Sequence, residues 1–254
     1  MCDAAIEISQ MTFGYDKDDK VFENLDLIIE KGKTTGLIGA NGAGKSTLLK
    51  LLVGLEKSDT GHIQIDGLTM SKKSLREIRS KIGYTFQDAD AQLFMTTVFE
   101  DVAFGIKDQS NDPEYIDQKV THALTAVNAV HLKNKPPYKL SGGEKRAVAL
   151  ATVLVMDPSI IVLDEPTTGL DPRGRRNLIE ILKKTHQTKI IATHDMEMAL
   201  EICDELIVMK DGQILLKDNP NSVFSNKDLL EASHLEQPMS VTRCPICQTS
   251  LGGK

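Results

Sequence analysis

The chain has 254 residues, of which 41% are hydrophobic and 26% charged, a balance that excludes an intrinsically disordered chain. Its net charge of −6 argues against a dedicated nucleic-acid-binding protein, and its longest apolar stretch, residues 147–156, is too short to span a membrane. We expect no secretory signal, and four cysteines that form one CxxC pair and two isolated residues indicate a reduced protein.

Strands and helices are predicted in alternation along the chain. The order begins with strands at Ala5–Phe13, Val21–Ile29 and Thr34–Gly39, a helix at Ser46–Val53, a strand at Gly61–Gly67, a short helix at Leu75–Arg79 and a strand at Ile82–Phe86. Residues 88–156 are predicted to be largely helical, with a clear helix at Glu114–Val130. Then come a strand at Ser159–Leu163, a helix at Arg173–Lys184, a strand at Lys189–Thr193, a helix at Met196–Cys203 and strands at Leu206–Met209 and Gln213–Leu216. This alternation predicts an α/β domain with a mostly parallel sheet.

A phosphate-loop pattern, GxxxxGK[ST], occupies residues 39–46 between a predicted strand and a predicted helix. Its glycines let backbone N–H groups face a phosphate, and the helix N-terminus adds partial positive charge. Lys45 is expected to reach the β- and γ-phosphates, and the Ser46 hydroxyl to bind Mg²⁺. The nucleotide-binding residues predicted in this segment are Gly39, Ala40, Asn41, Gly42, Ala43, Gly44, Lys45, Ser46 and Thr47.

An acidic pair, Asp164-Glu165, follows the apolar strand predicted at Ser159–Leu163. The strand directs Asp164 toward Mg²⁺ and places Glu165 to polarise an attacking water. Alone, such a pair is typical of a solvated strand end. Together with the phosphate loop it predicts a nucleotide hydrolase.

A second glycine-rich motif, Ser141, Gly142, Gly143 and Glu144, precedes a helical stretch and forms another anion-binding nest. One nucleotide does not need two nests on one chain, whereas two chains arranged head-to-tail do. With these motifs, the chain resembles the ATP-binding subunits of ABC transporters over nearly its whole length.

The resemblance implies a P-loop NTPase fold of the ABC-ATPase type, with a RecA-like parallel-sheet core, an antiparallel β subdomain and a helical subdomain at about residues 88–156. It implies an ATPase domain at residues 1–238, followed by a tail at residues 239–254. ATP and Mg²⁺ are the expected ligands, and both sites of a homodimer are expected to be active.

Four further site residues are assigned by the same resemblance. Tyr15 corresponds to an aromatic residue under adenine, and Gln87 to a glutamine that contacts Mg²⁺ and senses the γ-phosphate. Asp171 corresponds to a loop that crosses the dimer interface. His194 corresponds to a histidine that contacts the γ-phosphate and orients Glu165.

Residues 86–105, 140–154, 193–203 and 223–238 are similar to the ATPases of cobalt and nickel uptake systems of the energy-coupling-factor type. This similarity implies a peripheral subunit at the cytoplasmic face of the cell membrane, paired with an identical or a second ABC ATPase. Its other expected partners are a membrane-embedded coupling protein and a substrate-binding membrane component, without nucleic acid. The alternatives are an importer of a vitamin such as biotin, a soluble ABC ATPase that does not act in transport, and a non-catalytic ATP-binding clamp.

Two features have two interpretations each. Residues 88–94 are expected to belong to the docking surface for the membrane partner, where Leu93 and Phe94 either receive a partner helix or belong to the core. Cys244 and Cys247 either bind Zn²⁺, through two tails or with His234, or belong to a flexible reduced tail.

Overall fold

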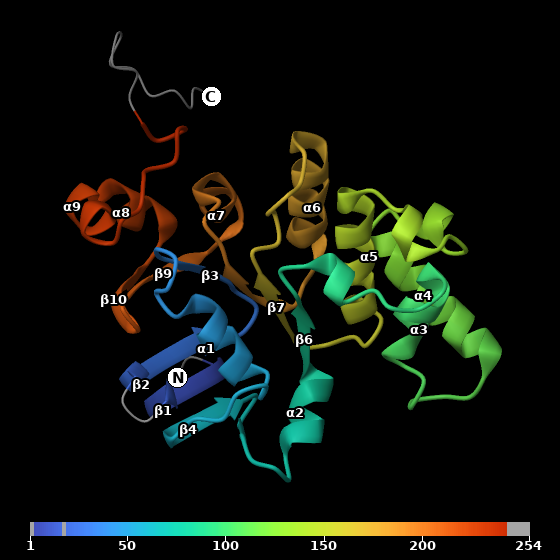
Figure 1. The fold of residues 1–254 in the computed structure, drawn as a ribbon, viewed down its shortest axis with the longest axis horizontal. Coiled ribbons are helices and arrows are strands. Elements are labelled where there is room, and N and C mark those ends of the chain that lie inside the picture. The colour runs from blue at the N-terminus through green and yellow to red at the C-terminus, as the bar shows by residue number, and fades with distance from the viewer. Residues whose placement is uncertain (1–2, 17–18, 243–254) are drawn as a thin grey trace. The chain divides into compact units, whose positions relative to one another are not determined.

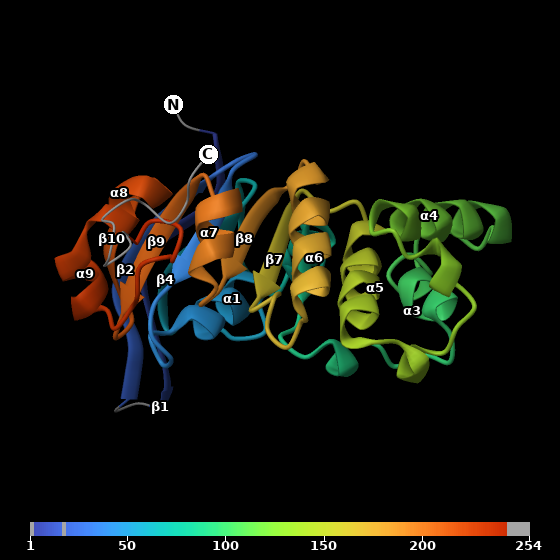
Figure 2. The same ribbon diagram turned by 90° about the horizontal axis from the view of Figure 1, so that it is seen from above.

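The computed structural model describes residues 3–16 and 19–242, drawn as ribbons in Figures 1 and 2. The chain divides into two compact units. The first contains residues 1–78 and 188–254, and the second is the continuous segment 79–187. Among the described residues, no helix combines the length and the apolar character that a bilayer-spanning segment needs.

An antiparallel sheet in the first unit confirms the predicted N-terminal strands. It consists of β1 (Ala4–Asp16), β2 (Asp19–Glu30), β4 (Thr60–Ile65) and β5 (Leu68–Thr69), in the order β2-β1-β4-β5. Along β2 the buried side chains are Phe22, Leu25, Leu27 and Ile29, and most residues between them face solvent. This alternation is what a sheet with one buried face requires.

A second set of strands in the first unit leads into the phosphate loop. β3 (Thr34–Ile38) pairs in parallel with β8 (Thr188–Ala192) and β9 (Glu205–Lys210), and β10 (Gln213–Asp218) is antiparallel to β9. Every residue of β3 and β8 is buried, as expected for central strands of a parallel sheet. Helix α1 (Lys45–Leu52) follows β3.

Three helices cover β3 and β9 with a common apolar cluster. They are α7 (Met196–Ile202), α8 (Pro220–Ser225) and α9 (Lys227–Ala232). The buried cluster consists of Ile38, Ala199, Cys203, Leu206, Val208, Val223, Phe224 and Leu230. The two short C-terminal helices were not predicted, although Asn219 caps the first, with Pro220 at its start, and Asn226 caps the second.

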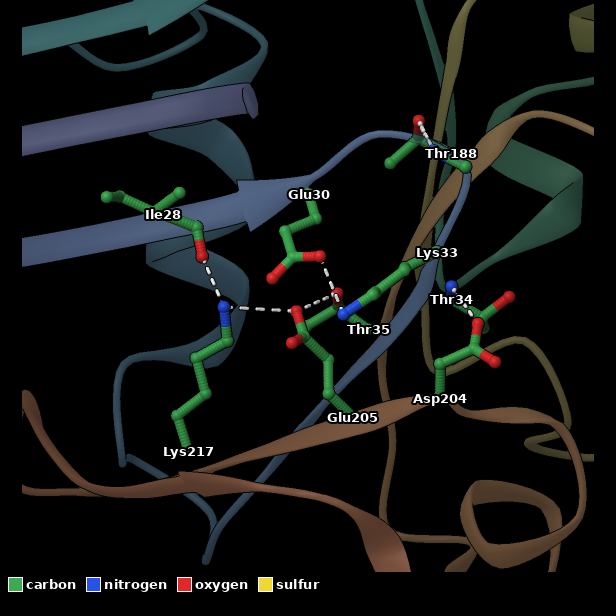
Figure 3. A network of polar contacts seen from close by, with 10 residues as sticks. Ile28, Glu30, Lys33, Thr34, Thr35, Thr188, Asp204, Glu205 and Lys217 are labelled. Carbon is green, nitrogen blue, oxygen red and sulfur yellow. Dashed lines mark hydrogen bonds and ion pairs between the residues drawn. The ribbon is translucent and has the colours of Figure 1, made fainter. Parts of the chain in front are cut away.

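Polar contacts join the two sets of strands in the first unit (Figure 3). The ammonium of Lys217 on β10 donates to the carbonyl of Ile28 on β2 at 2.5 Å and lies 3.2 Å from Glu205 Oε1 on β9. The same Glu205 oxygen accepts a hydrogen bond from Thr35 Oγ1 on β3 at 2.8 Å. The edge of the antiparallel sheet is therefore tied to β3.

The second unit combines two parallel strands with packed helices. β6 (Ile82–Thr85) is parallel to β7 (Ile160–Asp164), and α2 (Leu75–Lys81) precedes β6. The helices are α3 (Val98–Phe104), α4 (Pro113–Ala126), α5 (Gly142–Leu154) and α6 (Pro172–Lys184), of which α3, α4 and α5 pack on one another. Figure 2 shows these three helices grouped together.

The prediction of helix α4 was too long at its C-terminus. The helix ends at Ala126 and not at Val130. Asn128 has a φ of 58°, and this left-handed conformation ends helices and is tolerated by asparagine better than by most residues.

Candidate functional site

The phosphate loop leaves β3 at Gly39 and enters α1 at Lys45. A Cβ atom on Gly39 would lie 2.3 Å from the carbonyl oxygen of Met209 on β9, so only glycine allows this close approach. Gly42 has a φ of 84° and borders open space. The N-cap residue of α1 is Gly44, which has no side chain to cap the helix, and the partial positive charge of the helix N-terminus matches an anionic ligand.

Lys45 brings a cation into this loop. The residue is only 7% exposed, and its Nζ donates to the carbonyls of Gly39 at 2.7 Å and Ala40 at 3.1 Å. A buried ammonium needs polar or anionic partners. The loop, the helix N-terminus and this ammonium together fit a nucleoside triphosphate.

Tyr15 lies beside the start of α1. Its Oη is 3.2 Å from Thr47 Oγ1, within hydrogen-bonding distance. The ring packs edge-to-face on Phe13, with centroids 5.1 Å apart, and the residue remains 53% exposed. The structure thus brings two predicted site residues together and leaves an aromatic ring on which a purine can stack.

His194 follows β8 in the short connection to α7, and its side chain is exposed. Asp195, the next residue, caps α7 by accepting the N–H of Met198 at 2.9 Å. The backbone that carries His194 is therefore anchored on one side by a buried strand and on the other by a capped helix.

The predicted acidic pair closes β7 in the second unit. Asp164 is the last residue of the strand and is 4% exposed. Tyr84 Oη donates to Asp164 Oδ2 at 3.4 Å, and burial raises the pKa of this phenol well above its ordinary value, so it stays a donor. Sequence patterns did not single out Tyr84, because its role depends on the pairing of β6 with β7.

Glu165 follows in a left-handed backbone conformation. Its φ is 47°, and the residue is 8% exposed. This conformation costs a non-glycine residue about 1–2 kcal/mol and persists only where the surrounding structure imposes it. Such residues are concentrated at functional sites.

The Ser-Gly-Gly-Glu motif starts α5. Ser141 Oγ accepts the N–H of Glu144 at 3.3 Å, and Glu144 Oε2 accepts the N–H of Ser141 at 2.8 Å, which lowers the pKa of Glu144. A cavity of about 650 Å³ is lined by residues 141–144 and by Asp171, among others. The structure therefore brings the motif and Asp171 to one cavity, where Asp171 also caps α6.

Gln87 is exposed and follows β6. Its backbone carbonyl accepts a hydrogen bond from Arg146 Nη2 at 2.8 Å. Arg146 lies on α5 and was not among the predicted site residues. No clear sequence signal marked it, because Arg146 directly follows the charged residues Glu144 and Lys145 in the same helix.

Of the two residues considered for partner docking, the structure exposes one. Leu93 is 8% exposed and belongs to the core, so the docking interpretation does not hold for it. Phe94 is 63% exposed and packs edge-to-face on Phe104, with centroids 5.2 Å apart. Phe104 is itself 52% exposed. We call Phe94 and Phe104 the phenylalanine pair.

Metal binding was predicted at two places. Cys244 and Cys247 lie outside the described residues, and zinc binding there stays a prediction. In residues 3–16 and 19–242, no group of three or more His, Cys, Asp or Glu side chains is arranged to hold a metal ion. A Mg²⁺ ion that binds with a nucleotide needs no such group, since one or two carboxylates and the substrate phosphates suffice.

Comparison with known proteins identifies the family. A family model described as ABC transporter matches residues 22–168, which is more than half of the chain. The chain belongs to the ABC transporter family. This membership confirms the resemblance predicted from the motifs and makes the chain an ATPase that uses ATP with Mg²⁺.

Individual relatives within the ABC transporter family cover nearly the whole chain. A putative ABC transporter ATP-binding protein of Geobacter sulfurreducens is 43% identical over 95% of this chain and 97% of its own length. The energy-coupling factor transporter ATP-binding protein EcfA of Carboxydothermus hydrogenoformans is 40% identical over 93% of this chain and 88% of its own.

Solved structures of ABC proteins confirm the fold. The structure of cbiO1 from Clostridium perfringens, described as part of the ABC transporter complex cbiONQ, matches with a TM-score of 0.82. It is 37% identical and covers 91% of this chain and 94% of its own. A dimeric bacterial ABC transporter cassette matches with a TM-score of 0.77 at 27% identity, over 85% of this chain and 98% of its own.

Proposed function

We propose that the chain is the ATP-hydrolysing subunit of an energy-coupling-factor importer that takes up cobalt or nickel ions. The observation that carries the proposal is the near full-length similarity to cbiO1 and to the EcfA protein. The similarity of residues 86–105 and 193–203 to cobalt and nickel uptake ATPases supports the choice of substrate. The chain would act at the cytoplasmic face of the membrane, bound to a coupling protein and a substrate-binding component.

The first unit supplies the residues that bind ATP in this proposal. Adenine stacks on the exposed ring of Tyr15, and the phosphates bind to residues 39–47. Lys45 exchanges its loop carbonyls for oxygens of the β- and γ-phosphates. His194 donates to the γ-phosphate, the role that the family resemblance implies for it.

The second unit supplies residues for hydrolysis. The Mg²⁺ ligands that the family resemblance implies are Ser46, Gln87 and Asp164, and the bound ion would neutralise charge on the phosphates. Glu165 accepts a proton from the water that attacks the γ-phosphorus, and ADP and inorganic phosphate result. The hydroxyl of Tyr84, which donates to Asp164 Oδ2 at 3.4 Å, helps to orient this carboxylate.

A second ATPase chain, identical or related, completes each ATP site in this proposal. Residues 141–144 and Asp171 of one chain would face the nucleotide held by the other. Their position on one cavity supports this assignment, as does the similarity to a dimeric cassette.

Transport assays test the proposed substrate. The chain is expressed with the membrane proteins encoded beside its gene, and ATP-dependent uptake of cobalt, nickel and biotin into vesicles is measured. Uptake of cobalt or nickel, abolished by Glu165→Gln, is the expected result. Uptake of biotin alone would assign a vitamin importer, and ATPase activity without uptake of any would favour a non-transport role.

The phenylalanine pair is the proposed docking site for the coupling protein. Phe94→Glu is expected to reduce co-purification with the membrane partner by about tenfold or more, as loss of an aromatic anchor from an interface does. ATP affinity and thermal stability should not change, because the ring is exposed. The measurement is the ratio of the two proteins recovered after affinity purification.

A matched control is Tyr138→Glu, which places the same charge on another exposed aromatic residue of the second unit, 78% exposed. It should leave co-purification at the wild-type level. Equal losses in both variants, or no loss in Phe94→Glu, would contradict the docking assignment.

A further inference from the structure

We propose that Arg146 is a positioning residue, whose guanidinium holds the Gln87 segment and the loop before Asp171 in fixed register with the Ser-Gly-Gly-Glu motif. The inference rests on the proposed roles of Gln87 and Asp171. It adds a residue to that mechanism which the sequence motifs do not contain.

Arg146 lies on the first turns of α5, directly after the motif, and is 6% exposed. Its Nη1 donates to the carbonyl of Phe86, and its Nη2 to the carbonyl of Gln87, both at 2.8 Å. Nη2 also lies 3.4 Å from the carbonyl of Thr168, on the loop that leads to Asp171. The planar guanidinium presents its donors in a rigid fork, so these carbonyls have little freedom to move independently.

The buried environment of the Arg146 guanidinium couples the positions of the two segments that it binds. Burial lowers the pKa of Arg146, and the charge of Asp88 acts in the opposite direction. A buried cation is tolerated only while its donors are satisfied. Displacing the Gln87 segment would take acceptors from the guanidinium, and displacing the Thr168 loop would do the same. The positions of the two segments are therefore coupled through one side chain.

Two further side chains attach the same segment to α5. Lys145 Nζ lies 2.5 Å from Asp90 Oδ1. Gln92 accepts the N–H of Phe86 at 3.2 Å and donates to the carbonyl of Ala149 at 2.8 Å. These contacts fix residues 86–92 to the helix.

Packing alone does not explain an arginine here. The other buried residues of α5 are the apolar Ala147, Val148, Ala149, Leu150, Ala151 and Val153. At this buried position the helix has an arginine that donates hydrogen bonds to two loops with proposed site residues, where its other buried positions have apolar side chains. A substitution that keeps the positive charge but removes the forked donors therefore distinguishes a positioning role from a packing role.

The test is Arg146→Lys in the full chain, because lysine keeps the charge but cannot reach the carbonyls as a fork. We expect kcat for ATP to fall at least tenfold, with the Kd for ATP within about twofold of wild type. The Mg²⁺ concentration for half-maximal turnover should rise, since Gln87 is a proposed ligand. A melting curve confirms folding, and Arg176→Lys, at an exposed arginine paired with Glu180 on α6, is the matched control with wild-type kinetics expected.

A double-variant cycle shows whether Arg146 acts through Gln87. We expect Arg146→Lys to slow ATP turnover less in the Gln87→Ala background than in the wild type, with any remaining loss assigned to the loop before Asp171. The inference would be overturned if the rate losses of the two single variants multiply in the double variant, or if Arg146→Lys alone has the wild-type kcat. If Arg146→Lys does not fold, Asp90→Asn at an exposed position takes its place, with a loss of about twofold expected that disappears in the Gln87→Ala background.

The result of the Arg146 experiment does not depend on which substrate is transported. Failure of cobalt or nickel uptake would leave the ATPase measurements unchanged. A wild-type turnover of Gln87→Ala alone would instead remove the role of Gln87 and this inference with it.

Discussion

Glu165→Gln is expected to bind ATP as the wild type does and to hydrolyse it about 10²- to 10⁴-fold more slowly, the contribution typical of a general base. The amide has the size of the carboxylate and fits the same buried position, but it cannot accept the proton of the attacking water. Because ATP then persists, the variant should accumulate as a dimer at saturating Mg-ATP. Phosphate release, equilibrium binding of a fluorescent ATP analogue and size-exclusion chromatography measure the three effects.

The control for this substitution is Glu231→Gln, at an exposed position of α9, which should behave as the wild type. Glutamine is an unbranched residue of the same size as glutamate and tolerates the φ of 47° at residue 165 about as well, so loss of fold is not expected. Turnover within a few-fold of wild type would remove Glu165 as the base. A monomeric variant at saturating Mg-ATP would contradict the proposed pairing of two chains.

Lys45→Met is expected to weaken ATP binding by about 10- to 150-fold, which corresponds to the 1.5–3 kcal/mol of a hydrogen bond to a charged group. Methionine keeps the apolar stem of the side chain but removes the ammonium that lies over the loop carbonyls of Gly39 and Ala40. Hydrolysis should fall further than binding, because the negative charge on the transferred phosphoryl group is stabilised less. Titration of a fluorescent ATP analogue and steady-state phosphate release separate the two effects.

Lys50→Met provides the comparison on the same helix. Lys50 lies in the last turn of α1, away from the loop, so its loss should change ATP affinity less than twofold. Equal affinities in Lys45→Met and Lys50→Met would show that the phosphate loop does not bind the nucleotide as proposed.

Local sequence patterns correctly predicted the elements that consist of a continuous apolar run. The apolar runs at Thr34–Gly39, Ser159–Leu163 and Lys189–Thr193 became the buried strands β3, β7 and β8. The phosphate loop was found because its glycines and Lys45 act within a few residues of one another.

The unpredicted features depend on partners distant in the sequence. Arg146 and the carbonyl of Phe86 are 60 residues apart, and Tyr84 and Asp164 are 80 residues apart. Leu93 and Phe94 are adjacent and both apolar, and only the tertiary fold decides which of the two is buried. The two-residue strand β5 is too short to produce a periodicity.

The contacts of Lys217 and Glu205 reduce the backbone entropy that is lost when the chain binds ATP. They tie the antiparallel sheet, on which Tyr15 lies, to β3, from which the phosphate loop emerges (Figure 3). The proposed supports for the base and for the phosphates are thus parts of one framework that is ordered when the chain folds. Binding ATP then requires little further loss of backbone freedom, so most of the contact energy remains available as affinity.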